Sequence, residues 1–203
     1  MKLDPFYPIV PDFALAARLV PLGVKFLQLR IKDAPAETIR AEIAQTMQLC
    51  AEHDCLLVVN DYWREAIDLG ADFIHLGQED LAAADLGAIK RAGLKLGISS
   101  HSPEELGNAK AAEPDYVALG PVYETKLKKM PWAPQGLDRI REWRSALQCP
   151  LVAIGGITVE RAAGVLEAGA DSAAVITDIL TDAAPEARAR QWIAATQGWR
   201  ANS

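Results

Sequence analysis

Eight short apolar runs, each followed by a segment with helical spacing, dominate this sequence of 203 residues. The apolar runs cover residues 6–10, 26–32, 56–60, 73–77, 95–99, 116–120, 151–156 and 172–177. Helical spacing is found over residues 35–53, 82–92, 103–112, 136–147, 159–168 and 185–197, and more weakly over 12–22 and 63–69. Strict alternation of strand and helix implies parallel strands joined by right-handed crossovers. We therefore predict an α/β fold, a single-domain (β/α)8 TIM barrel over residues 1–203.

A doubly wound open sheet would share this alternation. That fold normally has a glycine-rich fingerprint directly after its first strand. The segment YPIVPDFAL at residues 7–15 contains no glycine. The barrel is therefore the favoured prediction.

Composition and charge restrict the partners. The formal net charge is −6, which argues against nucleic acid or an anionic membrane as a partner. No apolar run reaches the roughly 18 residues that a membrane-spanning helix needs, and the N-terminus does not resemble a signal peptide. Cys50, Cys55 and Cys149 lack CxxC spacing and lie among apolar residues, so we expect reduced core thiols in a cytoplasmic protein. The oligomeric state stays open, a homo-oligomer included.

The second apolar run carries polar side chains at every second position. Gln28, Arg30 and Lys32 share one face of the predicted strand, and we expect them to point into the barrel. Cations there would be costly without a partner. Because barrel sites lie at the carboxyl ends of the strands, an anionic ligand at that mouth would explain them. A structural ion-pair network inside the barrel is the alternative.

Other strand ends also carry polar residues. Asn60 and Asp61 end the third run, and Asp80 follows the fourth. Carboxylates of this kind, together with substrate phosphates, are typical Mg²⁺ ligands. Caps on the following helices are the alternative role for both acids. His75 by itself is typical of a hydrogen-bonded interior residue.

The fifth run ends at Ser99, which Ser100 and His101 follow. The segment GISSH at residues 97–101 does not match the GxSxG motif of hydrolases, and no oriented carboxylate is evident nearby from the sequence. We therefore do not expect a serine nucleophile.

Two further segments predict phosphate contacts. Gly155 and Gly156 follow the seventh run, where backbone N–H groups commonly hold a phosphate in this fold; a tight turn without a ligand is the alternative. The long loop after the sixth run carries Lys126, Lys128 and Lys129 and is predicted to be a lid, unless the lysines are merely solvated. A barrel that binds a diphosphate beside a monophosphate could join two substrates and release pyrophosphate.

Seven motifs together resemble the thiamine-phosphate synthase family. They are QLRIKD, VVND, HLGQED, GIS, ALGPVYETKLKK, VAIGGIT and GADSAAVITDI, and they occur in this order from about residue 6 to residue 180. The resemblance implies Mg²⁺-dependent transfer of aminohydroxymethylpyrimidine from its diphosphate to hydroxyethylthiazole phosphate. The products would be thiamine phosphate and pyrophosphate.

The resemblance also implies roles for individual residues. Asp61 and Asp80 would hold Mg²⁺. Catalytic roles are implied for Arg30, Lys32, Ser99 and Lys128, which would also bind substrate. The other substrate-binding residues would be Gln28, Asn60, Thr125, Gly156, Ile176 and Thr177.

This sequence departs from the family pattern near the predicted thiazole phosphate contacts. The family loop commonly reads P-T-x-T-K, whereas this chain has Glu124, Thr125, Lys126, Leu127 and Lys128. Thr177 stands where serine is common. Two other functions stay open at this point. One is a related thiazole-phosphate tautomerase or isomerase, which would need a histidine such as His75 or His101 for proton transfer. The other is a non-catalytic barrel that binds thiazole or thiamine phosphate.

Overall fold

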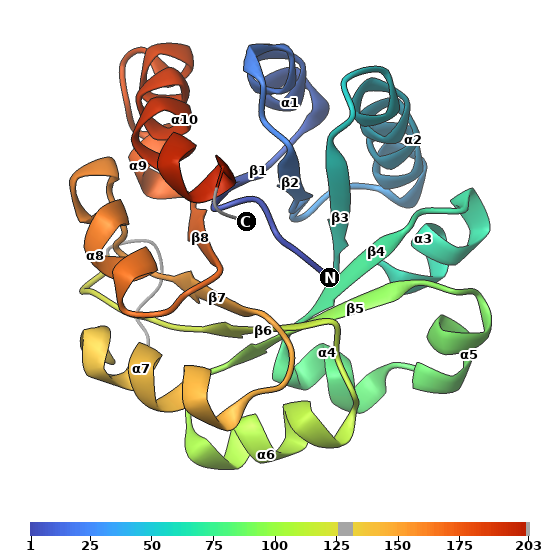
Figure 1. Ribbon diagram of the computed structural model, residues 1–203. Helices are drawn as coiled ribbons and strands as arrows, with labels where there is room; N and C mark the ends of the chain where they lie inside the picture. The colour runs from blue at the N-terminus through green and yellow to red at the C-terminus, as the bar shows by residue number, and fades with distance from the viewer. Residues whose placement is uncertain (126–131, 202–203) are drawn as a thin grey trace.

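Eight parallel strands form a closed barrel in the computed structural model, which describes residues 1–125 and 132–201 (Figure 1). The strands are β1 (Phe6–Val10), β2 (Phe26–Leu29), β3 (Leu56–Asn60), β4 (Phe73–Leu76), β5 (Lys95–Ser100), β6 (Tyr116–Leu119), β7 (Leu151–Ile154) and β8 (Ser172–Val175). They follow one another around the barrel in chain order, and β8 pairs with β1 to close it. The predicted (β/α)8 barrel is confirmed.

The helices surround the barrel (Figure 1). They are α1 (Phe13–Leu19), η1 (Val20–Leu22), α2 (Ala36–Glu52), α3 (Trp63–Leu69), α4 (Gln78–Ala83), α5 (Leu86–Arg91), α6 (Pro103–Ala111), α7 (Gly136–Ala146), η2 (Val159–Arg161), α8 (Ala162–Glu167), α9 (Thr177–Leu180) and α10 (Pro185–Ala201). The sequence patterns missed α4 and α9. Both are short and begin directly after a strand, where one turn of helix has no amphipathic period to detect. Among the described residues, no helix has the length and apolar character needed to cross a membrane.

Five predicted strands were too long at their carboxyl ends. The run at 26–32, for example, is a strand only as far as Leu29. One ladder bond continues beyond it, because the Arg30 N–H donates to the Val10 carbonyl at 2.8 Å. The chain then turns away from the ladder toward α2. Residues directly after a strand can continue its alternation of apolar and polar side chains, so this alternation alone does not show where the strand ends.

The barrel has two separate hydrophobic cores. The larger one lies between the strands and the helices and contains the outward side chains of β2, Leu27 and Leu29. The smaller one fills the lumen around Tyr7, Phe26 and Tyr116, with Leu3 from the N-terminus packed against it. Tyr7 stacks on Phe26 with ring centroids 3.8 Å apart. Because these side chains fill the lumen toward the amino ends of the strands, a ligand site inside the barrel must lie at the carboxyl ends.

Candidate active site

A small cavity of about 90 Å³ opens at the carboxyl ends of the strands. It brings together five predicted residues from four different parts of the sequence: Gln28, Arg30, Asn60, Ser99 and Ile176. The remaining lining residues are Tyr7, Ile9, His75, Ala118, Val152, Ile154 and Ala174. The cavity therefore has apolar walls and a few convergent polar groups, as small-molecule sites commonly do.

A chain of buried hydrogen bonds forms the floor of this cavity. Gln28 Nε2 donates to the Tyr7 hydroxyl at 2.9 Å, and the Tyr7 and Tyr116 hydroxyls lie 3.0 Å apart. Tyr116 in turn contacts His75 Nδ1 at 2.7 Å, and His75 Nε2 contacts Ser99 Oγ at 2.8 Å. The chain thus crosses the lumen from β2 to β5 and fixes each member in place.

These buried groups are uncharged near neutral pH. Burial lowers the pKa of His75 to about 4, so the imidazole is neutral. Burial also raises the pKa of the Tyr7 and Tyr116 hydroxyls above their ordinary value. Because both His75 nitrogens have partners, the expectation of a hydrogen-bonded interior histidine is confirmed. The sequence analysis missed Tyr7 and Tyr116, because in a strand an inward tyrosine has the same pattern as an apolar residue.

Two polar side chains at the cavity lack protein partners within the described residues. Arg30 is half-buried and forms no ion pair there. Asn60 is buried, and its Nδ2 group has no hydrogen-bond partner in that part of the chain. Buried polar atoms in proteins are almost always paired, so both side chains are arranged as ligand-binding groups would be. Within residues 1–125 and 132–201, Arg30 takes no part in an ion-pair network.

Asp61 and Asp80 form a carboxylate pair at the rim of the mouth. The Lys32 ammonium lies 2.8 Å from Asp61 Oδ2. Burial, followed by the charge of Asp61 and a hydrogen bond with it, raises the pKa of Asp80. Two acids held this close repel each other when both are ionised. The pair is therefore suited to bind a cation.

Neither acid serves as the helix cap that the sequence left open. The N-cap of α3 is Tyr62 and that of α4 is Gly77, both without a capping side chain. Asp61 also has a φ of 66°, in the left-handed region that only a few non-glycine residues adopt. Such a backbone is often found at functional sites. The chain turn at Asp61 thus aims its carboxylate at the rim instead of at a helix end.

The residues fit Mg²⁺ bound in part by substrate. No group of three or more acidic, histidine or cysteine side chains suited to a metal occurs in the described ranges. Mg²⁺ commonly uses only one or two protein carboxylates, with substrate phosphates and waters as its other ligands. Asp61 and Asp80 match that arrangement, whereas a closed protein-only metal site is not present in this part of the chain.

On the opposite side of the mouth, Gly155 and Gly156 form a tight turn after β7. Their φ angles are 101° and 63°. A Cβ on Gly156 would lie 2.4 Å from the Glu124 carbonyl oxygen, and one on Gly155 would lie 2.6 Å from Pro121 Cα. The glycines are therefore needed because two backbone segments approach closely. This supports the tight-turn reading of the pair; a phosphate contact at Gly156 stays a prediction.

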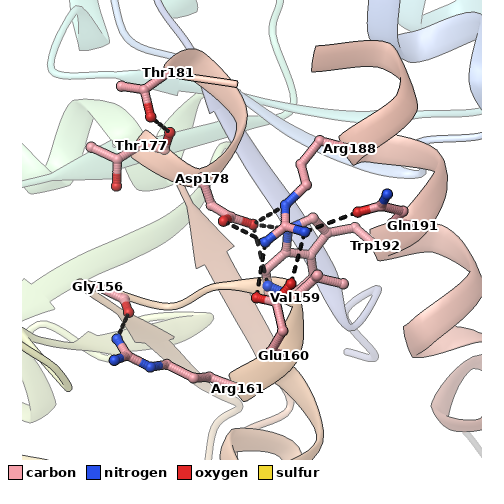
Figure 2. Close-up of polar contacts among 10 residues, drawn as sticks. All are labelled: Gly156, Val159, Glu160, Arg161, Thr177, Asp178, Thr181, Arg188, Gln191 and Trp192. Atoms are coloured by element: carbon pink, nitrogen blue, oxygen red, sulfur yellow. Dashed lines mark hydrogen bonds and ion pairs between the residues drawn. The ribbon is translucent and has the colours of Figure 1, made fainter. Parts of the chain in front are cut away.

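An ion-pair cluster centred on Arg188 holds the loops around this turn (Figure 2). The Arg188 guanidinium donates to Asp178 at 2.8 and 2.9 Å and to both Glu160 carboxylate oxygens at 2.9 Å. Asp178 also accepts bonds from Trp192 Nε1 at 2.7 Å and from the Val159 N–H at 3.2 Å. We call these four side chains, Glu160, Asp178, Arg188 and Trp192, the Arg188 cluster. It ties η2, α9 and α10 together, and its member Asp178 directly follows Thr177 in α9.

Some of the remaining predicted residues lie in the described part of the chain, and the others do not. Thr177 begins α9 directly after Ile176, and the pairing of β7 with β8 places this segment beside the Gly155–Gly156 turn. Thr125 is the last described residue before the gap. Predictions for Lys126, Leu127, Lys128 and Lys129 lie outside the described residues. His101 takes no part in the cavity: its Nδ1 lies 2.8 Å from Glu105, and its ring stacks on Trp132.

Comparison with known proteins identifies the family. A family model for thiamine monophosphate synthase matches residues 7–179. The chain belongs to this family. Thiamine-phosphate synthase from Rhizobium etli is 64% identical over 201 residues, covering 98% of both chains. Thiamine-phosphate synthase from Serratia proteamaculans is 47% identical over 191 residues, covering 94% of this chain and 87% of that one.

Solved structures agree with the family assignment. Thiamine phosphate pyrophosphorylase from Pyrococcus furiosus superposes with a TM-score of 0.85 at 28% identity, over 97% of this chain and 96% of that one. A 3-hexulose-6-phosphate synthase, at 19% identity and a TM-score of 0.66, shares the fold alone. Thiamine-phosphate synthesis, a transferase reaction, is the function that the comparisons support. They favour neither a thiazole-phosphate tautomerase nor a non-catalytic binding barrel.

Proposed function

We propose that this member of the thiamine monophosphate synthase family is a Mg²⁺-dependent transferase. It joins aminohydroxymethylpyrimidine diphosphate to hydroxyethylthiazole phosphate and releases pyrophosphate. One observation carries the metal-dependent part: Asp61 and Asp80 are held together at the mouth beside Lys32 and close to the cavity that contains Arg30. Two neighbouring carboxylates beside Lys32, with Arg30 in the adjacent cavity, are suited to a metal-bound diphosphate.

The diphosphate lies on the β2–β4 side of the mouth in this proposal. Asp61 and Asp80 would hold Mg²⁺, which supplies positive charge to the diphosphate as it leaves. Arg30 offers a planar fork that can donate to two phosphate oxygens at once, and Lys32 offers a point charge. Lys32 pairs with Asp61 in this structure. Mg²⁺ bound to Asp61 would replace that pairing, and the Lys32 ammonium could then contact the phosphate. Lys128 would add a further cation.

The pyrimidine ring would enter the cavity above the buried network. The unpaired Asn60 Nδ2 can donate a hydrogen bond to it, and Gln28 borders the same space. Ser99 has its hydroxyl fixed by His75. Because His75 is neutral, the floor can orient an uncharged ring without attracting the diphosphate inward. Orientation of this kind removes much of the entropic barrier between two bound substrates.

The reaction needs no nucleophile from the protein. The thiazole nitrogen supplies the electron pair that forms the bond to the pyrimidine methylene carbon, and the carbon–oxygen bond to the diphosphate breaks. Ser99 contacts His75, but Nδ1 of that histidine faces the Tyr116 hydroxyl instead of a carboxylate. The arrangement is therefore not a catalytic triad. The protein contributes positioning and charge stabilisation.

The thiazole phosphate would lie on the β7–β8 side. Gly156, Ile176 and Thr177 come from neighbouring loops there, and Thr125 lies on the preceding loop. The Arg188 cluster would hold these loops in register. All three cysteines are free, which supports a reducing compartment such as the cytoplasm.

A pyrophosphate-release assay tests the proposal. We expect release only when both substrates and Mg²⁺ are present, and loss of release when EDTA is added. Mass spectrometry should detect thiamine phosphate in equal amount. Absence of release with both substrates and Mg²⁺ would reject the proposed reaction, and release without the thiazole phosphate would show hydrolysis instead of transfer.

A further inference from the structure

A second and larger cavity, of about 560 Å³, lies at the opposite end of the barrel from the candidate active site. Its lining includes Phe26 and Leu56, which begin β2 and β3, so it opens at the amino ends of the strands. Cys50 and Cys55 both line this cavity. The proposed transfer reaction uses neither of them.

The end of α2 brings these two cysteines together. Asp54 has a φ of 51°, and the Cys55 N–H donates to the Cys50 carbonyl at 2.9 Å. This is a Schellman turn, in which the residues corresponding to Cys50 and Cys55 usually make a hydrophobic contact. Here two thiols occupy those places, and both line the same cavity. A disulfide requires α-carbons about 4.4–6.8 Å apart, and the backbone hydrogen bond between the two residues keeps Cys50 and Cys55 close together.

The surroundings distinguish Cys50 from the other two thiols. The hydrogen bond with Cys55 lowers the pKa of Cys50, although burial acts in the opposite direction. The pKa of Cys55 is instead raised by its interaction with Cys50 and by burial, and the charge of Lys25, which donates to the His53 carbonyl at 2.8 Å, offsets only part of that rise. Cys50 is therefore the attacking thiol. Thiolates are the nucleophiles of disulfide exchange. Cys149, by contrast, is half-buried, and burial raises the pKa of its thiol.

We propose that Cys50 and Cys55 form a redox-active dithiol that small disulfides oxidise through the cavity at the amino end of the barrel. The Cys50 thiolate attacks one sulfur of the small disulfide, forming a mixed disulfide and releasing one thiolate. Cys55, deprotonated as it reacts, then attacks the Cys50 sulfur and displaces the second thiolate. Two electrons pass to the small disulfide, which becomes two thiols after taking up the two protons. The product is a Cys50–Cys55 disulfide that links the end of α2 to the start of β3.

The rank order of reactivity separates this proposal from simple exposure. Cys50 is only 2% exposed and Cys55 only 8% exposed, whereas Cys149 is more accessible. Exposure alone would therefore make Cys149 react first. The proposal requires the reverse order, because a lowered pKa and a neighbouring thiol speed exchange.

The test uses the folded full-length chain and oxidised glutathione. After acid quenching and alkylation, cleavage at Glu52 separates Cys50 from Cys55 unless a disulfide joins them. We expect the joined peptides from monomeric protein, formed roughly tenfold faster than any adduct at Cys149. Cys55→Ser should stop the reaction at a mixed disulfide on Cys50. Cys149→Ser, the matched control, should oxidise like the unaltered chain.

Three results would overturn the proposal. One is preferential modification of Cys149. Another is reaction of Cys50 and Cys55 only when urea unfolds the chain, and the third is a disulfide between chains instead of within one. The wild-type chain alone decides these outcomes, so a serine variant that fails to fold does not affect the test.

Discussion

The two halves of the barrel mouth hold their charged groups in different ways. On the β2–β4 half, Arg30 has no ion-pair partner among the described residues, and the Asp61–Asp80 contact is repulsive. On the β7–β8 half, the Arg188 guanidinium is satisfied by Asp178 and Glu160. One half thus keeps charge available, and the other uses charge to hold loops.

This difference separates the expected effects of mutation. Unpaired charges, repelling charges and exposed ion pairs such as Lys32–Asp61 stabilise the fold little, so changes on the β2–β4 half should lower activity and leave stability intact. Charges within the Arg188 cluster are partly buried, and their loss should unfold the loops that carry the thiazole phosphate residues. The following predictions test that contrast, from the largest expected effect to the smallest.

The largest effect is expected from removing a carboxylate charge at the rim. Asp61→Asn or Asp80→Asn should lower turnover by about 100- to 1,000-fold, a range typical of losing one preorganised electrostatic group. The folded state raises the pKa of Asp80 above its ordinary value of 3.8. Ionisation of Asp80 therefore destabilises the fold as the pH rises above 3.8. Asp80→Asn should therefore leave Tm at pH 7.5 unchanged or slightly higher. Pyrophosphate release over a range of Mg²⁺ concentrations and Tm measure both effects.

Glu79→Gln is the matched control for these two variants. Glu79 lies next to Asp80 in the first turn of α4 and is exposed. Its charge is the smallest of the named influences on the pKa of Asp80, so the variant removes one negative charge but keeps both carboxylates of the pair, and Mg²⁺ dependence should be retained. Normal Mg²⁺ dependence in both Asp→Asn variants would contradict the metal assignment.

Arg30→Lys keeps the charge on β2 but removes the planar fork. Charge-assisted hydrogen bonds contribute about 1.5–3 kcal/mol each, so loss of one should reduce kcat/KM by roughly ten- to hundredfold. Tm should stay the same, because Arg30 forms no ion pair in residues 1–125 and 132–201. A lower Tm with normal kinetic constants would show that Arg30 is structural.

Arg188→Gln should affect the other half of the mouth and, unlike Arg30→Lys, the whole fold. Breaking a largely buried ion pair costs about 3 kcal/mol or more, and Tm should fall by roughly 6–12 °C for a chain of this size. The loosened loops should raise KM for thiazole phosphate roughly tenfold, with KM for the pyrimidine diphosphate unchanged. Steady-state kinetics below the new Tm measure the separation.

Arg18→Gln is the control for Arg188→Gln. Arg18 on α1 pairs with Glu186, which lies on α10 as Arg188 does, but both side chains of this pair are more than one-third exposed. Exposed pairs contribute less than about 1 kcal/mol, so this variant should change neither Tm nor KM appreciably. Equal increases of both KM values in Arg188→Gln would mean that the cluster supports the barrel as a whole.

The smallest effect is expected at the exposed edge of the cluster. The hydrogen bonds from Arg188 hold the pKa of Glu160 at about 2, below its ordinary value of 4.5. The ionised carboxylate therefore stabilises the fold above pH 4.5, and this contribution is lost as pH falls from 4.5 to about 2. Glu160→Gln should lower Tm by at most about 3 °C at pH 6, because the side chain is largely exposed. The difference from wild type should disappear toward pH 2.

The arrangement of strands was predictable because the same unit recurs along the chain. Alternation of apolar and helical segments identified the barrel, and the rule that sites lie at the carboxyl ends of barrel strands then singled out Asp61, Asp80 and Arg30. Both steps need only local patterns and one general rule. The contact of Asp61 with Asp80 follows from the pairing of neighbouring strands.

Contacts across the barrel were not predictable in the same way. The Tyr7–Tyr116 hydrogen bond joins residues 109 positions apart, and strand period does not show which inward residues meet. Arg188 lies on a helix whose pattern shows a buried and an exposed face, but not its partners on η2 and α9. The contact of Cys50 with Cys55 depends on a left-handed residue at Asp54, which the spacing of the cysteines does not reveal.

The dependence of each substrate's apparent KM on Mg²⁺ concentration tests the division of the mouth most directly. It requires only the unaltered chain, with one substrate saturating while the other is varied. Our account predicts that KM for the pyrimidine diphosphate falls steeply as Mg²⁺ is raised, while KM for the thiazole phosphate stays constant. A parallel fall of both values, or no change in either, would contradict the assignment of the metal to Asp61 and Asp80 on one side only.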